Sequence, residues 1–333
     1  MIDKKILVTG AAGFIGRSLI TKLVETGYQV TGLDDLSRGD YNLLPKKIRL
    51  NSNLVVGNVL DYNTILKLVK KTGSVIHLAA GSSFIMYEEN PQTETCNTVI
   101  GFLNILEAMK ESSVNKIVYA STSAVYEGNK SPWSENMILN PPDLKSISKY
   151  ANELMANEYA KRYKIDAIGL RPFNPYGVGE ISKNHFASTQ SLFLWAMLAG
   201  KNPIIFGDGT QERDFIYIDD VITAFIKALG IKGADQYNIG TGIGTSLNTL
   251  VKIIDKHLDA NLKPKYVPIP IPIYADKIVA DTKKSVEYLG FSAKIKLEDG
   301  IKKMVNELKE IIKSKPHLSD CQNYNFNKLL HRT

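Results

Sequence analysis

A glycine-rich turn between an apolar strand and an amphipathic helix constrains this chain more than any other feature of its sequence. Ile6 to Thr9 predict a buried parallel strand, the residues that follow predict a tight turn, and the sequence from Phe14 onward predicts a helix. Such a turn leaves backbone N–H groups and the positive helix end facing outward, which favours a bound pyrophosphate. We expect Gly10 to make the turn, Gly13 to let phosphate approach, and Gly16 to let the helix pack on the strand.

The next expected strand ends in a carboxylate, Asp34, which lies 18 residues after Gly16. A carboxylate at this position accepts hydrogen bonds from the hydroxyls of an adenosine ribose and repels a phosphate there. The pattern therefore favours NAD over NADP as the cofactor. Two points remain open: Asp34 as a solvated acid at a strand end, and Arg38 as a weak signal for NADP.

Further apolar segments alternate with amphipathic ones along the chain. The expected strands are 54–61, 74–81, 116–123 and 167–171, and the expected helices include 62–71, capped by Asp61, and 97–110. This alternation predicts an α/β fold with a doubly wound parallel sheet, in which ligands bind outside the carboxyl ends of the strands. The candidate positions gather at these ends: Gly10, Asp34, Asn58, Ala79 and Thr122. We interpret His77, inside an apolar strand, as a packed core residue.

Composition excludes several classes of function. The chain has 333 residues, and its 41 Lys and Arg exceed its 34 Asp and Glu by seven, but the basic residues are scattered, which argues against a nucleic-acid partner. The two cysteines, Cys96 and Cys321, have neither a disulfide framework nor metal-ligand spacing, so we expect no metal. No apolar run reaches membrane-spanning length and no signal peptide is seen, so the expected location is cytoplasmic.

The chain resembles the extended short-chain dehydrogenase/reductase family, which contains nucleotide-sugar epimerases and dehydratases. The stretches that carry the resemblance are Thr9–Gly16, Asp34, His77–Ala80, Ser121–Tyr126, Ser148–Lys149, Leu170–Gly177 and Gly207–Phe215. They occur in the family's order between residue 6 and about residue 310, and they are most similar to UDP-hexose 4-epimerases.

The resemblance implies a Rossmann domain that binds NAD over residues 1–172, interleaved with a nucleotide-sugar lobe over 173–315, and a polar tail over 316–333. It also implies a homodimer, formed through the helices that start near Asn97 and Lys149. The cofactor residues that it implies are Gly10, Gly13, Phe14, Ile15, Gly16, Asp34, Asn58, Val59, Leu78, Ala79, Ala80 and Lys149.

The resemblance also implies a catalytic Ser or Thr, a Tyr, and a Lys four residues after the Tyr. Thr122 would bind the sugar oxygen, with Ser123 beside it, and Lys149 would hold the nicotinamide ribose. Position 145, where the family has Tyr, is Lys in this chain. Tyr150 cannot replace it, because it lies one residue after Lys149, about 100° further around the helix than Lys149, and so faces elsewhere.

Lys145 has two interpretations. Two lysines at this spacing share one helix face, so their repulsion lowers the pKa of one, and a neutral Lys145 amine could act as the general base. That role needs its pKa to fall by roughly three units from about 10.4, which requires burial as well. The alternative is that Lys145 marks an impaired or altered site. Asp143 and Tyr176 are the nearest other bases by sequence.

The second half of the chain would supply the site for a nucleotide-diphosphate sugar, expected to be a UDP-sugar. Asn174 and Arg213 match residues that contact the diphosphate in the family, and a guanidinium suits that contact through its paired donors. The alternative for Arg213 is a salt bridge to Asp214 or Asp219. The family often has a further arginine where this chain reads 269–274, which has none, so the base is open. Tyr87, His185 and Phe186 fall where the sugar pocket is usually lined.

Ala124 bears on the reaction. Family dehydratases and decarboxylases have an acid at this position, which moves a proton at the neighbouring carbon. The alanine therefore favours hydride exchange at one carbon, as in a 4-epimerase. A dehydrogenase or reductase with net redox, and a silent protein that binds NAD and nucleotide sugar, remain the alternatives.

Overall fold

The structure is a computed structural model that describes residues 4–269 and 274–314. Its main element is a seven-stranded sheet in the order β3-β2-β1-β4-β5-β6-β9, with every neighbouring pair parallel. The strands are β1 Lys5–Thr9, β2 Gln29–Asp34, β3 Ser52–Val56, β4 Ser74–His77, β5 Lys116–Ala120, β6 Asp166–Pro172 and β9 Ala234–Ile239. The doubly wound α/β fold predicted from the sequence is thus confirmed. The tail 316–333 and residues 270–273 lie outside the described residues.

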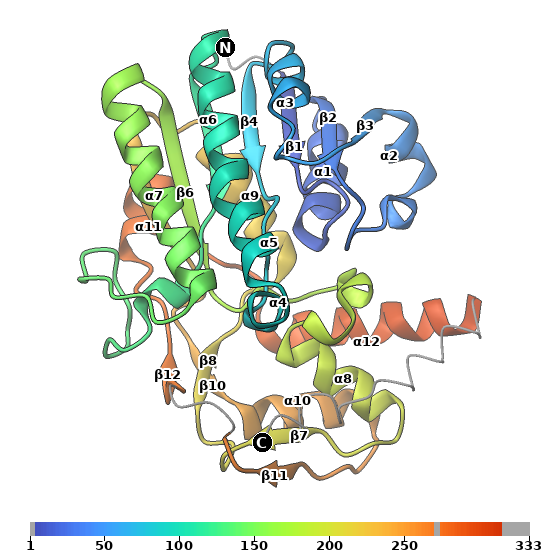
Figure 1. The fold of residues 1–333 in the computed structure, drawn as a ribbon. Helices are drawn as coiled ribbons and strands as arrows, with labels where there is room; N and C mark the ends of the chain where they lie inside the picture. The colour runs from blue at the N-terminus through green and yellow to red at the C-terminus, as the bar shows by residue number, and fades with distance from the viewer. Residues whose placement is uncertain (1–3, 270–273, 315–333) are drawn as a thin grey trace.

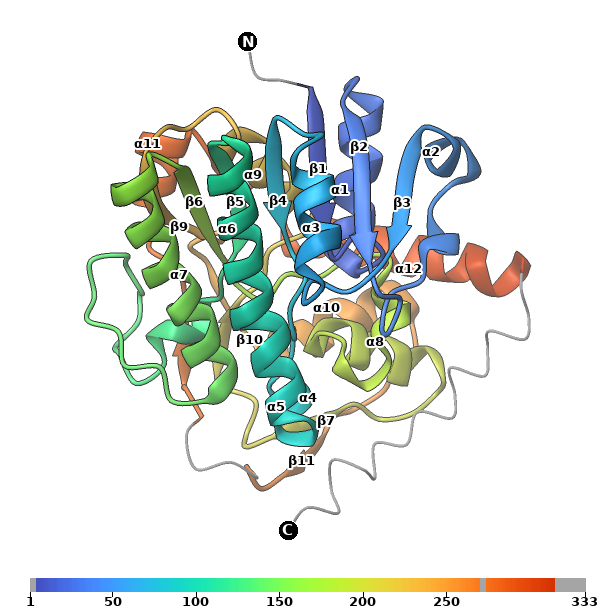
Figure 2. The same ribbon diagram turned by 45° about the horizontal axis from the view of Figure 1, so that its top comes forward.

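Helices cover both faces of the sheet, because successive strand residues point to opposite sides. In β1, Ile6 and Val8 join one apolar cluster and Leu7 joins another, and all three are fully buried. One face is covered by α1 (Phe14–Glu25) and α9 (Ile218–Ala228), which contact each other. Three helices lie side by side on the other face: α3 (Tyr62–Val69), α6 (Gly101–Ser112) and α7 (Leu144–Tyr163) (Figure 2).

The strand order reverses between β1 and β4, and this reversal opens a crevice at the carboxyl ends of the strands. The register aligns these ends: Thr9 pairs with His77, and His77 with Tyr119. The expected strands ran a few residues past them, into segments that leave the sheet. The sheet also extends beyond residue 172 of the chain, because β9 joins it beside β6.

A second lobe lies beyond the carboxyl ends, on the side toward which the strands point (Figure 1). Its helix α10 packs against α8, α12 and strand β10. The lobe also contains two small sheets, one formed by β10, β8 and β12 and the other by β11 and β7. The bounds are β7 Ile204–Phe206, β8 Glu212–Asp214, β10 Gly244–Ser246, β11 Lys265–Val267, β12 Lys277–Ile278, α8 Thr189–Leu198, α10 Leu247–Leu258 and α12 Leu297–Ser314.

The helix expected at 97–110 begins earlier than its apolar pattern indicates. Helix α5 starts at Pro91 and continues through a π-helical turn, Cys96–Ile100, into α6. Proline favours the first turn of a helix, where its missing N–H has no partner to lose. The remaining helices are α2 Lys46–Leu50, α4 Phe84–Glu89 and α11 Lys283–Leu289. By contrast, Asp61 caps α3 as predicted, accepting from the Thr64 N–H.

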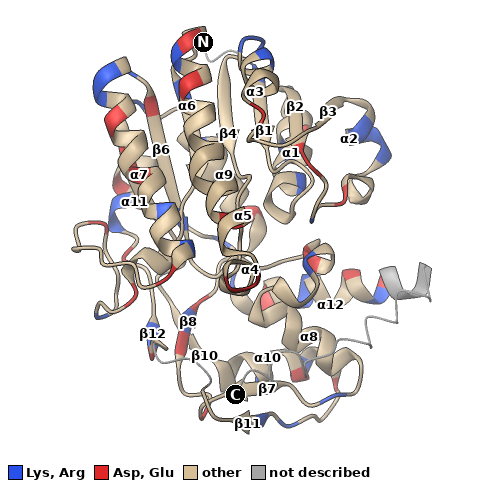
Figure 3. Cartoon of the chain, in the orientation of Figure 1, with Lys and Arg blue, Asp and Glu red and all other residues tan. Residues whose placement is uncertain are grey.

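Charged residues of both signs are spread over the helices, and Lys and Arg do not form one stripe in this view (Figure 3). Within the described residues, no helix combines the length and the apolar character that crossing a membrane requires.

A buried ion pair ties α7 to the sheet. The Arg171 guanidinium, at the end of β6, donates to both carboxylate oxygens of Glu153 at 2.8 and 2.6 Å, and the two side chains are 3% and 2% exposed. Ser121, just after β5, donates to the same carboxylate at 2.5 Å. This contact raises the pKa of Arg171, despite its burial, because the carboxylate stabilises the charged guanidinium. The position of α7 is therefore set from two strands.

We expect Glu153→Ala to lower the free energy of unfolding by about 3–5 kcal/mol, because it leaves a buried guanidinium without its partner. The matched control is Glu158→Ala on the same helix, whose ion pair with Arg162 is exposed and whose loss should cost at most about 1 kcal/mol. Denaturant unfolding followed by circular dichroism measures both. Equal losses in the two variants would contradict the role given to the buried pair.

Candidate active site

One cavity of about 1180 Å³ occupies the crevice and continues to the second lobe. Its wall includes every predicted site residue except Arg213 and Tyr87: Gly10, Gly13, Phe14, Ile15, Gly16, Asp34, Asn58, Val59, Leu78, Ala79, Ala80, Thr122, Ser123, Lys145, Lys149, Asn174, His185 and Phe186. These residues come mainly from the ends of six strands and from the starts of α1 and α7. Positions far apart in the sequence are thus brought to one surface.

The glycine turn has the shape that a dinucleotide needs. Gly10 has φ +68°, and a Cβ there would lie 2.8 Å from the Ala79 nitrogen. A side chain would therefore collide with the backbone just after β4. A Cβ at Gly16 would lie 2.1 Å from the Gly10 oxygen, so α1 could not pack this closely. Gly13 begins α1 without a side-chain cap. The first N–H groups of α1 are therefore available to an anion.

Asp34 is held at the end of β2 by two backbone donors, the Ala12 N–H at 2.9 Å and the Leu36 N–H at 2.8 Å. Burial raises the pKa of its carboxyl group, and these two donors oppose that rise. Each carboxylate oxygen retains acceptor capacity for a ribose hydroxyl. Together with the glycine turn and the uncapped helix, this arrangement fits the adenosine and pyrophosphate of a dinucleotide.

Arg38 lines the same end of the cavity but is already engaged. Its guanidinium donates to Glu94 at 2.5 Å and lies over the Phe186 ring, 5.1 Å from the centroid. Glu94 is buried, so the pair links the loop after β2 to α5. This pairing weakens the interpretation of Arg38 as a sign of NADP.

His77 is a packed core residue, as predicted. It is 1% exposed, its Nδ1 lies 2.8 Å from the Thr9 hydroxyl, and burial lowers its pKa to about 3. The Thr9 hydroxyl also accepts from the Leu78 and Ala79 N–H groups, both at 3.3 Å. The contact thus fixes β1 against β4 at the floor of the crevice.

Lys145 and Lys149 of α7 both line the cavity, and Lys149 is anchored by a hydrogen bond. Its Nζ donates to the Ala120 carbonyl at 2.8 Å. The pKa of Lys149 falls to about 7, chiefly through burial and secondarily through the charge of Lys145. The lowered pKa predicted for one lysine of the pair is thus that of Lys149. Thr122 lines the same cavity, and its hydroxyl accepts from the Ala124 N–H at 3.2 Å.

The other candidate bases lie away from the cavity. Asp143 caps α7, accepting from the Ser146 N–H at 2.8 Å, and Tyr176 is buried with its hydroxyl 3.3 Å from the Leu297 carbonyl. Tyr150 packs against a separate apolar cluster that contains Trp133. None of the three lines the cavity.

The residues expected at the diphosphate divide into two groups. Asn174 lines the cavity and donates to the Asp214 carbonyl at 2.9 Å. Arg213 is buried outside the lining, donates to the Glu212 carbonyl at 2.8 Å, and lies over Tyr274, 5.0 Å from its centroid.

Neither predicted salt bridge of Arg213 forms among the described residues. Asp214 accepts from the Thr241 and Gly242 N–H groups, both at 2.9 Å, and Asp219 pairs with Lys303 at 3.3 Å. The salt-bridge alternative is therefore wrong for this structure, and the diphosphate role stays a prediction.

Of the three residues expected in the sugar pocket, His185 and Phe186 line the cavity and Tyr87 does not. The hydroxyl of Tyr87 lies 2.6 Å from that of Thr98, in the core between α4 and the π-helical turn. Tyr87 is therefore a packing residue.

Asn97 and Glu127 are among the polar residues of the wall that were not predicted. Asn97 lies in the π-helical turn, and its Oδ1 is buried without a hydrogen-bond partner among the described residues. Such turns are frequent at functional sites, but the sequence pattern there indicated only a helix. Glu127 follows the Ser121–Tyr126 stretch directly and also lines the cavity. Its adjacency to that stretch was the available signal.

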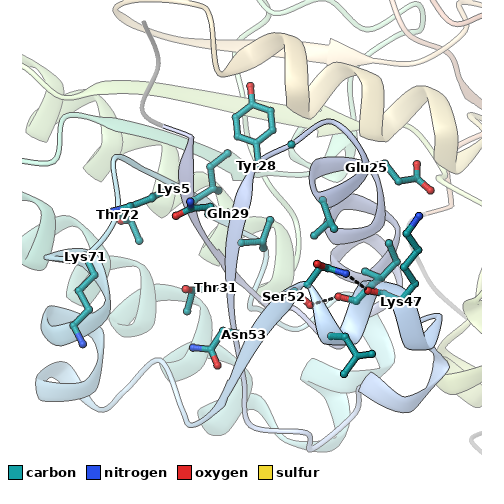
Figure 4. Close-up of a pocket in the computed structure, with 17 residues that line it drawn as sticks. Lys5, Glu25, Tyr28, Gln29, Thr31, Lys47, Ser52, Asn53, Lys71 and Thr72 are labelled. Atoms are coloured by element: carbon teal, nitrogen blue, oxygen red, sulfur yellow. Dashed lines mark hydrogen bonds between the residues drawn. The ribbon is translucent and has the colours of Figure 1, made fainter.

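A second hollow, of about 860 Å³, lies at the opposite edge of the sheet (Figure 4). Its labelled lysines do not converge: Lys47 and Lys71 lie at opposite sides of the view. Because parallel sheets bind ligands at the carboxyl ends of their strands, the cavity at the crevice is the candidate active site.

Comparisons with known proteins agree with this geometry. The model of the NAD dependent epimerase/dehydratase family matches residues 6–240. A UDP-glucose 4-epimerase of Mycolicibacterium smegmatis is 33% identical over 306 residues, which cover 90% of this chain and 96% of that protein.

Two solved structures are similar over 92% of this chain and 99% of theirs. They are a UDP-glucose 4-epimerase of Thermotoga maritima with UDP-glucose, at 32% identity and TM-score 0.88, and a UDP-glucuronic acid 4-epimerase of Bacillus cereus with UDP-glucuronic acid and NAD, at 27% and 0.83.

We expect the buried lysine to make stability depend on pH. With a folded pKa near 7 and an unfolded value of about 10.4, Lys149 binds more protons in the unfolded chain between these values. In protein freed of bound nucleotide, the free energy of unfolding should therefore rise with pH above 7, by roughly 1 kcal/mol per pH unit, relative to Lys149→Met. The exposed Lys161→Met is the control. Wild type and Lys149→Met curves that run parallel to pH 9.5 would contradict this assignment.

Proposed function

Because this chain belongs to the NAD-dependent epimerase/dehydratase family, we propose that it is a nucleotide-sugar 4-epimerase that uses NAD. The observation that carries the proposal is a single cavity that joins the dinucleotide cradle around Gly10 and Asp34 to Thr122, Lys145 and Lys149. When bound, NAD would supply reversible hydride transfer at carbon 4 of the sugar, with the hydride returned to the other face of the rotated keto sugar.

The chain's own residues bind and orient the reactants. Asp34 accepts from the adenosine ribose, and the first turn of α1 holds the pyrophosphate. Lys149 holds the nicotinamide ribose, and Thr122 binds the reacting sugar oxygen. An ammonium group has three donors and no acceptor, so Lys145 suits a hydrogen bond donated to that oxygen.

We propose a UDP-sugar as substrate, of the UDP-glucose and UDP-galactose type. Asn174 and Arg213 are assigned to the diphosphate of the donor. Ala124 lines the cavity where an acid would be needed to move a proton at the neighbouring carbon, which supports epimerisation over dehydration. Because Lys145 replaces the family's tyrosine, the second candidate function is that of an impaired variant, which binds NAD and nucleotide sugar.

Incubation with UDP-glucose, UDP-galactose, UDP-glucuronate and the N-acetyl forms tests the function. We expect chromatography of the products to show that UDP-glucose and UDP-galactose interconvert. The reaction should leave no lasting absorbance from reduced nicotinamide. Denatured protein should release NAD and not NADP, because the same cofactor molecule is reused. A lasting absorbance would indicate a net dehydrogenase, and binding without turnover would indicate the impaired variant.

We further propose a homodimer formed through α6 and α7. Ile147 and Leu154 on α7 are 46% and 52% exposed, and Ile100 before α6 is 45% exposed. Residues seven apart share one helix face, so Ile147 and Leu154 form an apolar surface that a second copy can cover.

Light scattering at micromolar concentration should give the mass of two chains for wild type and of one chain for Leu154→Glu. Leu50→Glu is the control, because Leu50 is 74% exposed on α2, away from this surface. A monomeric wild-type protein, or a Leu154→Glu protein that stays dimeric, would overturn the assembly.

A further inference from the structure

Glu127 places a carboxylate in the wall of the active-site cavity. It is half-buried, and its side chain makes no hydrogen bond or ion pair within the part of the chain that the structure describes. It lies five residues after Thr122 and lines the same cavity as Lys145 and Lys149. A carboxylate with acceptor capacity therefore faces the space assigned to the sugar.

The backbone of Glu127 is held rigidly. Thr122 caps a 3-10 turn over Ser123–Tyr126, and the Glu127 N–H donates to the Ala124 carbonyl at 3.2 Å. Tyr126 is fully buried and donates to Asn238 Oδ1 at 2.8 Å, while the Arg171 guanidinium donates to its hydroxyl. The turn that carries both Thr122 and Glu127 is thus anchored to the sheet, as a preorganised site requires.

The charged groups around Glu127 are Lys145 and Asp143 from α7 and Arg213 from β8. Burial raises the pKa of the Glu127 carboxyl group, and the Lys145 ammonium is the strongest of the charges acting against that rise. No ion pair within 4.0 Å joins Glu127 to Lys145 among the described residues. The two opposite charges therefore line the same cavity without forming an ion pair with each other.

We propose that Glu127 takes the proton from the reacting sugar hydroxyl and returns it, in the role that a tyrosine at position 145 would have. Lys145 is then a positioning residue, which holds the hydroxyl oxygen through a donated hydrogen bond. This inference rests on the proposed 4-epimerase function and names the group that moves its proton.

The step balances with the cofactor already proposed. The O–H bond of the hydroxyl would break and its proton would bond to a Glu127 oxygen, while the O–H bonding pair would form the new C=O bond. The hydrogen on carbon 4 would leave with its C–H bonding pair as a hydride, which bound NAD would accept. The return reverses both transfers on the other face of the sugar, so no net oxidant is consumed. An ammonium has no lone pair to accept this proton, whereas a carboxylate does.

The pH dependence of kcat/KM tells whether Glu127 or Lys145 accepts the proton. Glu127 must be unprotonated to accept a proton, so the wild-type value should rise with pH through the pKa of Glu127 and then level. In Glu127→Gln this acidic limb should vanish and kcat should fall by about 10²–10⁴-fold. In Lys145→Ala the limb should persist and move to higher pH, because an ammonium that lowers the pKa of Glu127 is removed.

Glu135→Gln is the matched control. Glu135 is another half-buried glutamate whose pKa burial raises, but it accepts from the Asn238 N–H at 2.7 Å and lies outside the cavity. Its variant should keep the acidic limb. A Glu127→Gln protein that retains the limb, or that turns over within tenfold of wild type, would overturn the proposal.

Calorimetry with UDP and UDP-glucose provides a test without turnover. UDP binding to each protein is the reference, because the proposed contact of Glu127 is with the sugar, whereas Arg213, which is assigned to the diphosphate, also lies near this carboxylate. UDP-glucose should bind wild type more tightly above the pKa of Glu127 than below it, and Glu127→Gln should lose this difference. If no sugar is epimerised, the proposed function fails while this measurement still decides the contact: identical pH dependence in both proteins would refute it.

Discussion

The ion pair between Glu153 and Arg171 is the contact on which the active-site geometry depends. It joins the middle of α7 to the end of β6, and Ser121 connects the same carboxylate to the end of β5. Arg171 also donates to Tyr126, which anchors the turn between Thr122 and Glu127. Three segments that supply reacting groups are therefore positioned by one buried charge cluster, and a shift of any of them moves the others.

The local geometry of the expected cofactor side could be predicted from the sequence because its signals are local. A glycine turn, an acid at a strand end and a helix cap each depend on a few adjacent residues, and the structure places Gly10, Asp34 and Asp61 as expected. Asp34 keeps its place through two backbone donors close to it in the chain or across one strand pair. Such contacts follow from the strand–turn–helix pattern alone.

The substrate side was harder to predict because it depends on contacts between distant segments. Glu127 acquires its surroundings from α7 and β8, and Asn97 faces the cavity from a π-helical turn that apolar periodicity cannot distinguish from a regular helix. The pKa of Lys149 is lowered mainly by burial, which depends on the packed fold. Arg213 matched the family's motif yet lies behind the wall, where its guanidinium covers Tyr274.

The last strand of the sheet has a consequence for the order in which this protein can fold during synthesis. β9 pairs with β6 only after the ribosome has made residues up to 239, and Asp235 and Gln236 give it a polar pattern that suits an edge strand. Until then β6 presents unpaired backbone groups, and α1 lacks its neighbour α9. The nascent first half of the chain therefore exposes the unpaired edge of β6 and the apolar face of α1. A chaperone acting at this stage would protect the chain from association with other copies.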